Sequence, residues 1–141
     1  MGDDDEAELA VLARGQLVAV VPVSDWREAI GFYRDTLGLP LAEEVASQNE
    51  ARYAVGDAIL ITYQSVGAGQ SRHTVAAFVV DDVDAAVADL RGRGVVFEEY
   101  DLPEIKTENG IALFGDTREA WFRDPDGNLL AVGTRIADAA A

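Results

Sequence analysis

The chain has 141 residues and carries 26 Asp and Glu against 11 Lys and Arg, a formal net charge of −15. It contains no cysteine, which excludes disulfides, thiolate metal sites and cysteine nucleophiles. Its acidity argues against nucleic acid or an anionic membrane as a partner, because both are bound through Lys and Arg.

The chain begins with an acidic segment. Residues 1–14 hold five acidic residues and one arginine, and we predict a flexible tail there. An acidic start is the opposite of a signal peptide, and no apolar run approaches the roughly 20 residues that cross a bilayer. We therefore expect a cytoplasmic protein.

Residues 15–66 follow the order strand, helix and three strands, which we call the first module. The apolar run at 16–23 predicts a strand. Asp25 begins a helix, with Glu28 placed as in a capping box, and Gly38 ends it. Further strands are predicted at 41–45, 51–55 and 58–63.

The same pattern restarts after a linker at 67–71. The second module is predicted over residues 72–135, followed by a tail at 136–141. A strand at 73–80 precedes a helix capped by Asp82. Strands are then predicted at 95–100, 119–123 and 129–134, with a long loop at 102–117.

The two modules form an internal repeat. Val23-Ser24-Asp25 and Val80-Asp81-Asp82 occupy equivalent places before the two helices. One helix and four strands are too few to bury a sheet face alone. We predict an α+β protein in which paired βαβββ modules form a curved, eight-stranded mixed sheet around a cavity, with the helices outside.

Several motifs resemble the vicinal oxygen chelate superfamily, which includes glyoxalase I, bleomycin-resistance proteins and extradiol dioxygenases. Residues 23–39 are similar to its first module, and Phe32-Tyr33 followed by Leu37-Gly38 is the most diagnostic part. Residues 80–86 and 121–128 resemble the helix start and closing hairpin of its second module. The resemblance implies the fold predicted above. Enzymes of this superfamily hold a divalent metal with His, Glu or Gln from four strands.

The resemblance places those four metal ligands at Val18, Leu60, Val75 and Ala131. All four side chains are apolar and cannot donate an electron pair to a metal. We therefore expect no metal and no other cofactor, and we assign no catalytic residue. An alternative is a displaced site built from His73, which is the single histidine, with Gln16 and Glu119.

Candidate ligand-binding residues come from strand alternation, which places residues two apart on one face. The resemblance also points Trp121 into the cavity, with Glu119 on the same face. The third strand offers Arg52 or Tyr53, and the long loop with Phe114 is expected to form a lid. The candidate set is Gln16, Arg52, Tyr53, Thr62, His73, Phe114, Glu119 and Trp121.

These observations favour a metal-free small-molecule-binding protein of the glyoxalase/bleomycin-resistance type. We expect a homodimer that sequesters an aromatic or cationic antibiotic or metabolite, since a negative field attracts cations. The alternative is a metal-dependent glyoxalase- or dioxygenase-like enzyme with a displaced site. A third hypothesis is a regulatory or structural protein whose cavity is filled by Trp121, Phe114 and Tyr63.

Overall fold

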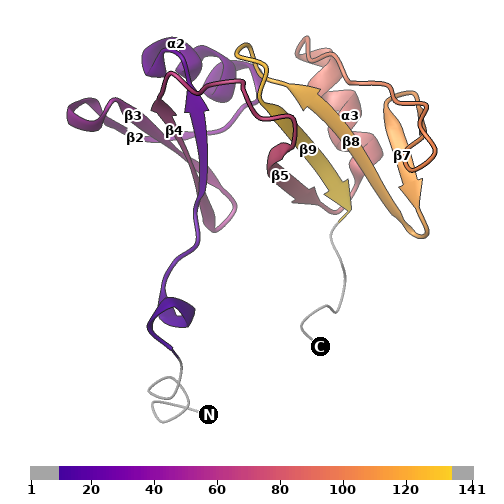
Figure 1. Ribbon diagram of the computed structural model, residues 1–141, viewed down its shortest axis with the longest axis horizontal. Helices are drawn as coiled ribbons and strands as arrows, with labels where there is room; N and C mark the ends of the chain where they lie inside the picture. The colour runs from indigo at the N-terminus through magenta and orange to yellow at the C-terminus, as the bar shows by residue number, and fades with distance from the viewer. Residues whose placement is uncertain (1–9, 135–141) are drawn as a thin grey trace.

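A computed structural model describes residues 10–134 of the chain. The predicted α+β class is confirmed, but the strands form one sheet of four and one of five instead of a single sheet of eight (Figure 1). The predicted tails at 1–14 and 136–141 fall largely outside the described residues. Of the first tail the structure describes residues 10–14, and Val11–Arg14 forms a short 3-10 helix, η1. No helix within residues 10–134 is long and apolar enough to cross a membrane.

The first sheet has the strand order β1-β4-β3-β2, and β1 runs parallel to β4 while the other pairs are antiparallel. We call this sheet and its helix, residues 19–64, the first half. Its elements are β1 (Ala19–Val23), α2 (Trp26–Ile30), η2 (Gly31–Thr36), β2 (Leu41–Val45), η3 (Ala46–Gln48), β3 (Glu50–Val55) and β4 (Ala58–Gln64).

The helix of the first half begins as the sequence predicts. The Asp25 carboxylate accepts hydrogen bonds from the backbone N–H groups of Arg27, at 3.0 Å, and Glu28, at 3.2 Å. The helix then widens into the π-helical turn η2, where the Leu37 N–H donates to the Phe32 carbonyl at 2.8 Å. Residue 38 follows at φ 80°, a conformation that favours glycine, and the helix ends.

The second sheet has the order β5-β9-β8-β7-β6, with β5 parallel to β9. We call this sheet and its helix, residues 74–134, the second half. The Asp82 side chain caps its helix by accepting from the Ala85 N–H at 3.0 Å, as predicted. The elements are β5 (Thr74–Val80), α3 (Val83–Gly92), β6 (Thr107–Glu108), β7 (Ile111–Phe114), β8 (Thr117–Arg123) and β9 (Leu129–Thr134).

Two predictions about the second half are wrong. The segment 95–100 is not a strand, and within it Phe97 makes only one isolated bridge, to Phe122. The predicted loop at 102–117 instead contains β6 and β7. Val95 and Phe97 are buried while Val96 is 80% exposed, so the segment has the alternating burial of a strand. Val95 and Phe97 pack into the core, but the segment does not pair with a neighbouring strand as a ladder.

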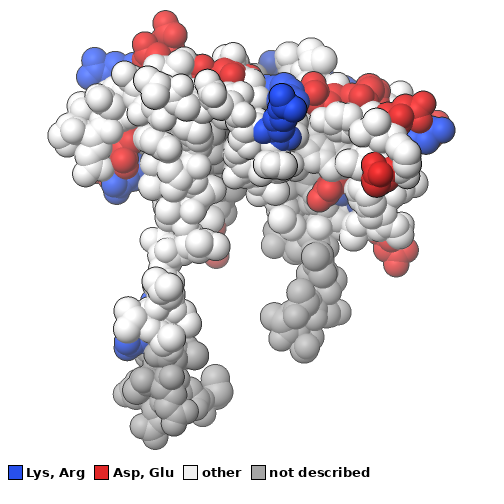
Figure 2. Space-filling model, in the orientation of Figure 1, with Lys and Arg blue, Asp and Glu red and all other residues white. Residues whose placement is uncertain are grey.

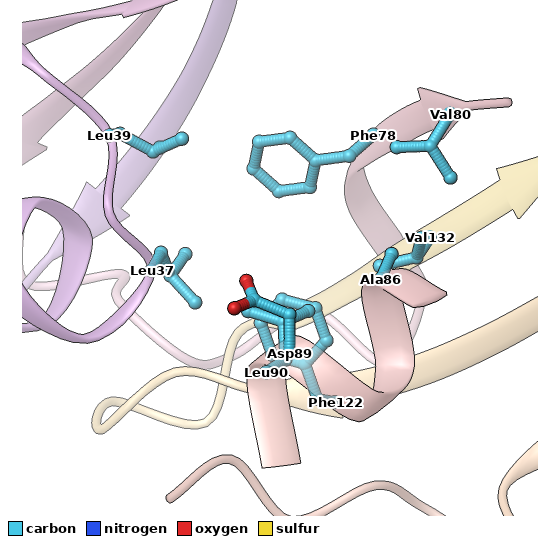
Figure 3. Close-up of a pocket in the computed structure, with 9 residues that line it drawn as sticks. All are labelled: Leu37, Leu39, Phe78, Val80, Ala86, Asp89, Leu90, Phe122 and Val132. Carbon is cyan, nitrogen blue, oxygen red and sulfur yellow. The ribbon is translucent and has the colours of Figure 1, made fainter. Parts of the chain in front are cut away.

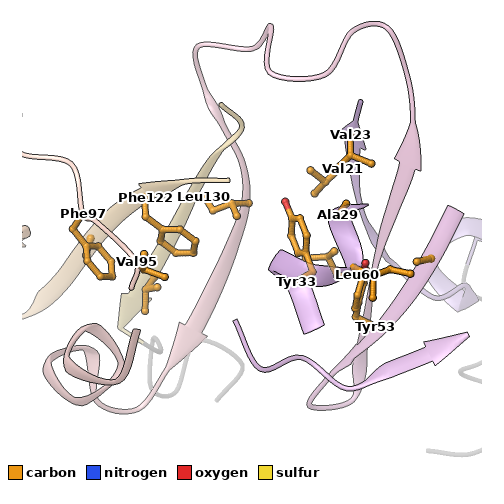
Figure 4. Packing of buried hydrophobic residues seen from close by; sticks show 14 of the residues in the cluster. Val21, Val23, Ala29, Tyr33, Tyr53, Leu60, Val95, Phe97, Phe122 and Leu130 are labelled. Carbon is orange, nitrogen blue, oxygen red and sulfur yellow. The ribbon is translucent and has the colours of Figure 1, made fainter. Parts of the chain in front are cut away.

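One hydrophobic cluster joins the two halves. It contains residues from the helix-covered face of each sheet, among them Val21, Tyr53 and Leu60 from the first and Phe122 and Leu130 from the second (Figure 4). The two helix-covered faces therefore share one core. The opposite face of each sheet is not covered by a helix, so its side chains can contact other surfaces.

The turn after β8 locks the halves together. The buried carboxylate of Asp124 accepts hydrogen bonds from the Tyr33 hydroxyl at 2.7 Å and from the side-chain amide of Asn128 at 2.8 Å. That amide also donates to the Pro22 carbonyl at 2.7 Å, and its oxygen accepts from the Gly69 N–H at 3.1 Å. The lock therefore connects β1, the helix, the linker and the last hairpin.

An apolar cleft lies between the two halves. Leu37 and Leu39 face Phe78 and Val80 across it, with α3 along one side (Figure 3). Its volume is about 150 Å³. The halves are thus joined by the hydrogen bonds of the lock and by the shared core, and a small apolar cleft remains between them.

Candidate functional site

The strand register determines which side chains lie on the helix-free face of the first sheet. Val20 is paired with Ile61, and Ile61 with Arg52, across three adjacent strands. Because paired residues share a face, these three side chains lie together, opposite the helix. Val20 is 48% exposed, so this aliphatic surface is open in the single chain.

Thr62 and Leu60 lie on the other face, although the sequence analysis placed both toward the cavity. Thr62 is paired with Val21 and Ala51 in the core and is fully buried. Its hydroxyl and that of the buried Tyr53 lie 3.2 Å apart. A one-residue change in register moves every side chain of a strand to the opposite face, and the β3–β4 turn sets this register. Of the two residues offered by the third strand, Arg52 is therefore the one on the helix-free face.

Arg52 is flanked by acidic side chains. Its Nε lies 2.9 Å from a Glu50 carboxylate oxygen, and its Nη1 lies 3.5 Å from Glu43. The first sheet therefore presents an aliphatic surface next to Arg52, whose positive charge is neutralised by the two carboxylates.

The helix-free face of the second sheet is aromatic. Trp121 is paired with Ala131, and Glu119 with Gly133, so all four lie on this face. A Cβ atom at residue 133 would lie 3.2 Å from Cγ of Glu119, which shows that the glutamate side chain lies flat over the glycine. Within residues 10–134, the side chain of Glu119 makes no hydrogen bond and no ion pair. A half-buried carboxylate thus lies beside an indole without a protein partner.

A segment from the same half covers Trp121. The rings of Tyr100 and Phe114 meet it edge to face, with centroids 5.6 Å and 6.4 Å away, and Ile105 packs against the cluster that contains Trp121. Trp121 is consequently only 7% exposed, whereas Phe114 is 42% exposed. We call residues 99–107 the flap. Phe114 belongs to β7 and not to the flap, so it contacts Trp121 from a strand and not from the predicted loop.

Three hydrogen bonds fasten the flap at its base. The Thr107 hydroxyl donates to the Glu99 carboxylate at 2.6 Å and accepts from the Tyr100 N–H at 2.7 Å. The Gly110 N–H also donates to Glu99, at 2.9 Å. These donors, the Thr107 hydroxyl first, hold the pKa of Glu99 below its usual value because they favour the ionised form.

The remaining candidate residues lie apart from this aromatic face. Gln16 is exposed in the segment before β1, and His73 is exposed just before β5. Strand β9 lies between β5 and β8, the strand that carries Glu119. Across the described part of the chain, no three His, Asp or Glu side chains are grouped closely enough to hold a metal ion.

Residues 15–132 match the glyoxalase/bleomycin resistance protein/dioxygenase superfamily. The chain belongs to this superfamily. The uncharacterized protein YraH of Bacillus subtilis (strain 168) is 31% identical over 127 residues, which cover 78% of this chain and 90% of YraH. The resemblance inferred from the motifs is therefore confirmed.

Two solved structures illustrate the fold. A glyoxalase/bleomycin resistance protein/dioxygenase from Alicyclobacillus acidocaldarius gives a TM-score of 0.66 at 17% identity, covering 89% of this chain and 94% of its own. The fosfomycin resistance protein FosX from Listeria monocytogenes gives 0.62 at 14% identity, covering 88% and 95%. At such identities these likenesses show the fold alone.

The metal that the superfamily implies does not fit this chain. The side chains at the four expected positions, Val18, Leu60, Val75 and Ala131, are all apolar, and Leu60 also lies on the helix-covered face. A shift to the neighbouring residues of β4 gives only Ile59 or Ile61. The donor set is therefore unsuited to a divalent ion at this place.

Sequence reasoning missed the cover over Trp121. Tyr100 and Ile105 come from a segment predicted as strand and loop, and no periodic pattern marks them as contacts of the indole. The available signal was their size, since an aromatic and a large aliphatic residue in a polar loop need a partner surface.

Proposed function

We propose that this protein binds a small aromatic or cationic organic molecule without a metal, on the helix-free face of its second sheet. The observation that carries the proposal is the carboxylate of Glu119, which lacks a partner among the described residues and lies on the same face as Trp121 and Phe114. An aromatic surface with an adjacent carboxylate attracts organic cations through charge and through the faces of the rings.

The chemistry of this face suits binding better than turnover. It supplies aromatic edges, small aliphatic side chains and one carboxylate, and these support burial and stacking of an organic guest. Catalysis on a carbonyl or a catechol requires a group that stabilises developing negative charge, and the aromatic side chains and Glu119 offer none.

We extend the proposal to a homodimer as the functional unit. The helix-free face of each sheet lies opposite the core shared by the two halves. In the single chain, Val20 on the first of these faces and Phe114 on the second are exposed. In a dimer, the aliphatic surface around Val20 and Ile61 of one copy would cover the part of the partner's second sheet that lies around Phe114. Exposed Val20 and Phe114 support this arrangement.

A ligand screen tests the proposal. Purified protein is analysed for divalent metals and then screened by thermal shift against aromatic and cationic natural products, each with and without added metals. A ligand at 100 times its Kd adds roughly 2.7 kcal/mol of stability and is readily detected.

Glu119→Gln then identifies the site, with Glu108→Gln as the matched control on an exposed residue of the same half. We expect about tenfold weaker binding of a cation in Glu119→Gln and unchanged binding in the control. Stoichiometric metal, with turnover of a methylglyoxal–thiol adduct or a catechol that is lost on chelation, would overturn the proposal in favour of an enzyme.

The burial of Trp121 favours a second candidate function. Its ring is already covered by Tyr100, Phe114 and Ile105, as expected if the face now stabilises the fold of a regulatory or structural protein. A complete screen with no thermal shift from any compound would support this second function.

A further inference from the structure

The second half has an open groove on its outer side, between α3 and β7. The groove has a volume of about 430 Å³, and both elements lie in the right-hand part of the molecule in Figure 1. Its apolar residues include Val87 of α3 and Ile111 and Leu113 of β7. Ile111 is paired with Ala120 of the core, so the groove lies on the helix-covered face of the sheet. It is therefore on the opposite side of the sheet from Trp121.

The floor of the groove is apolar and open to solvent at one end. Helix α3 packs on β8 and β9, and β7 lies beyond these two strands in the sheet. Val87 is buried and Ile111 is half-buried, but Leu113 is 63% exposed although its pairing with Arg118 places it on the helix-covered face. A concave apolar surface of this kind favours a ligand that covers it.

The guanidinium of Arg91 is fixed at the end of the groove where β7 begins. An Nη2 N–H group donates to the Asn109 carbonyl at 2.7 Å, and Cζ lies 5.5 Å from the centroid of the Phe97 ring. Residue 110 has φ 80°, and a Cβ atom there would lie 2.9 Å from Nη2, so glycine makes room for the guanidinium. An arginine held in this way loses little conformational freedom when it binds a ligand.

Arg91 makes no ion pair within residues 10–134, although the chain holds 26 acidic residues against 11 basic ones. The Asn109 carbonyl takes one of the five N–H groups of its guanidinium, so donors remain for a ligand. At the Leu113 end of the groove, by contrast, Arg118 is paired with Asp84 at 3.3 Å. Arg91 is therefore the cation of the groove that can accept an added anion.

The carboxylate of Glu99 responds to the charge of Arg91 but is bound by other groups. The Thr107 hydroxyl and then the Gly110 N–H lower the pKa of Glu99, and Arg91 adds a smaller effect in the same direction. Both of these groups donate hydrogen bonds to the same carboxylate oxygen of Glu99, at 2.6 Å and 2.9 Å. Glu99 thus belongs to the base of the flap and does not occupy the groove.

The charge of the groove differs from that of the surface as a whole. Arg91 and Arg118 are matched by two acidic residues, Asp84 and Glu108, so the formal charge of the groove is zero in a chain of −15. In Figure 2, Asp and Glu are spread over the upper and right-hand parts of the visible face, with fewer Lys and Arg among them. A small anion is repelled by most of this protein, and in the groove that repulsion is locally cancelled.

We infer that this groove binds a small amphipathic monocarboxylate, with its carboxylate on Arg91 and its apolar body over Ile111 and Leu113. A guanidinium binds a carboxylate through two parallel N–H···O bonds, which gives both affinity and orientation. The groove volume falls within the range of small-molecule sites, roughly 300–1,000 Å³. This second site is separate from the aromatic face around Trp121 and takes a ligand of the opposite charge.

Isothermal titration calorimetry of the full chain with octanoate tests the inference. Octanoate has one carboxylate and an unbranched apolar body. Two related probes separate these parts, because octan-1-ol keeps the apolar chain without the charge, and acetate keeps the charge without the chain. We expect octanoate to bind with a Kd below about 1 mM, whereas the other two probes should give no binding isotherm over the same concentration range.

Arg91→Gln removes the charge at the site, and Arg93→Gln is the matched control. Arg93 is exposed, is paired with Asp89 at 3.2 Å and does not line the groove. Octanoate should bind at least about tenfold more weakly to Arg91→Gln and unchanged to the control. Because Arg91→Gln also loses the bond to Asn109, Leu113→Ser gives an independent check. It should weaken octanoate binding about threefold and keep the circular dichroism spectrum.

The position of the bound octanoate gives a separate readout. Chemical-shift changes in the amide NMR spectrum should appear at Asn109, at Leu113 and along α3, and not around Trp121. Equal affinity in Arg91→Gln and wild type, shift changes that gather around Trp121, or no binding at about 1 mM octanoate would each overturn the inference. None of these results decides the ligand of the aromatic face, which is judged by the thermal-shift screen.

Discussion

The two halves share one topology but differ on their helix-free faces. In the first half this face is an open aliphatic surface next to the ion pairs of Arg52 with Glu50 and Glu43. In the second half it is an aromatic cluster around Trp121, covered by the flap. The segment after α3, and not the repeated fold, gives the second half its own cover, whereas the corresponding face of the first half stays open in the single chain.

The largest expected effect follows from this difference. Trp121→Ala should lower the free energy of unfolding by about 3 kcal/mol or more, because it removes a buried indole from contact with Tyr100 and Phe114. Val20→Ala, at the half-exposed equivalent surface of the first half, should cost less than about 1 kcal/mol. Urea denaturation at low protein concentration measures both, and equal costs would contradict the proposed asymmetry.

The second prediction compares a bond between the halves with a bond inside one. Tyr33→Phe removes the hydroxyl that donates to the buried carboxylate of Asp124 and should cost about 1.5–3 kcal/mol. Tyr53→Phe removes a neutral contact with Thr62, at 3.2 Å, and should cost about 1 kcal/mol or less. The same denaturation experiment applies, and a larger loss in Tyr53→Phe would show that the halves are not joined chiefly at Asp124.

The third prediction concerns alkaline pH. Burial, and then the charge of Asp124 and the hydrogen bond to it, raise the pKa of Tyr33 well above its ordinary value of 10.0. Above about pH 10 the unfolded chain therefore releases the tyrosine proton while the folded chain keeps it, so stability must fall as the pH rises.

This loss should be smaller in Tyr33→Phe, which has no hydroxyl to ionise. Unfolding free energies measured from pH 8 to pH 11 give the difference in slope between the two proteins. Parallel curves would show that another group is responsible for the alkaline loss.

The smallest expected effect lies in the flap. Thr107→Val removes the hydroxyl that donates to Glu99, so the pKa of Glu99 should rise toward its usual value. NMR titration of the glutamate side chain measures this change. Thr117→Val removes a comparable hydroxyl bond, to the Phe114 carbonyl at 2.9 Å, and should leave Glu99 unchanged.

The sequence predicted the elements whose signals are local. Asp25 and Asp82 cap their helices because a side-chain oxygen at that position meets free N–H groups, which requires no knowledge of the rest of the fold. The superfamily motif and the α+β class were likewise predictable, since they rest on residues close together in the chain.

The features that depend on distant contacts were not predictable. The face on which Thr62 lies depends on the register of β3 against β4, and β7 forms a strand by pairing with β6 and β8. Among the candidate site residues, Glu119 and Trp121 lie together on one face as expected. Tyr53 instead belongs to the core, where Tyr33 packs against it.

The lock at Asp124 gives the linker a role beyond connecting the halves. Residue 69 has φ 72°, and a Cβ atom there would clash with the carbonyl oxygen of Asp126, so only glycine allows the linker to pass this turn and bond to Asn128. The linker is therefore held in one path and has a fixed length. A circularly permuted chain should tolerate new ends at the exposed turn of Gly56 and Asp57. Cutting or lengthening the chain at residue 69 should weaken the coupling of the two halves even though every strand and helix is kept.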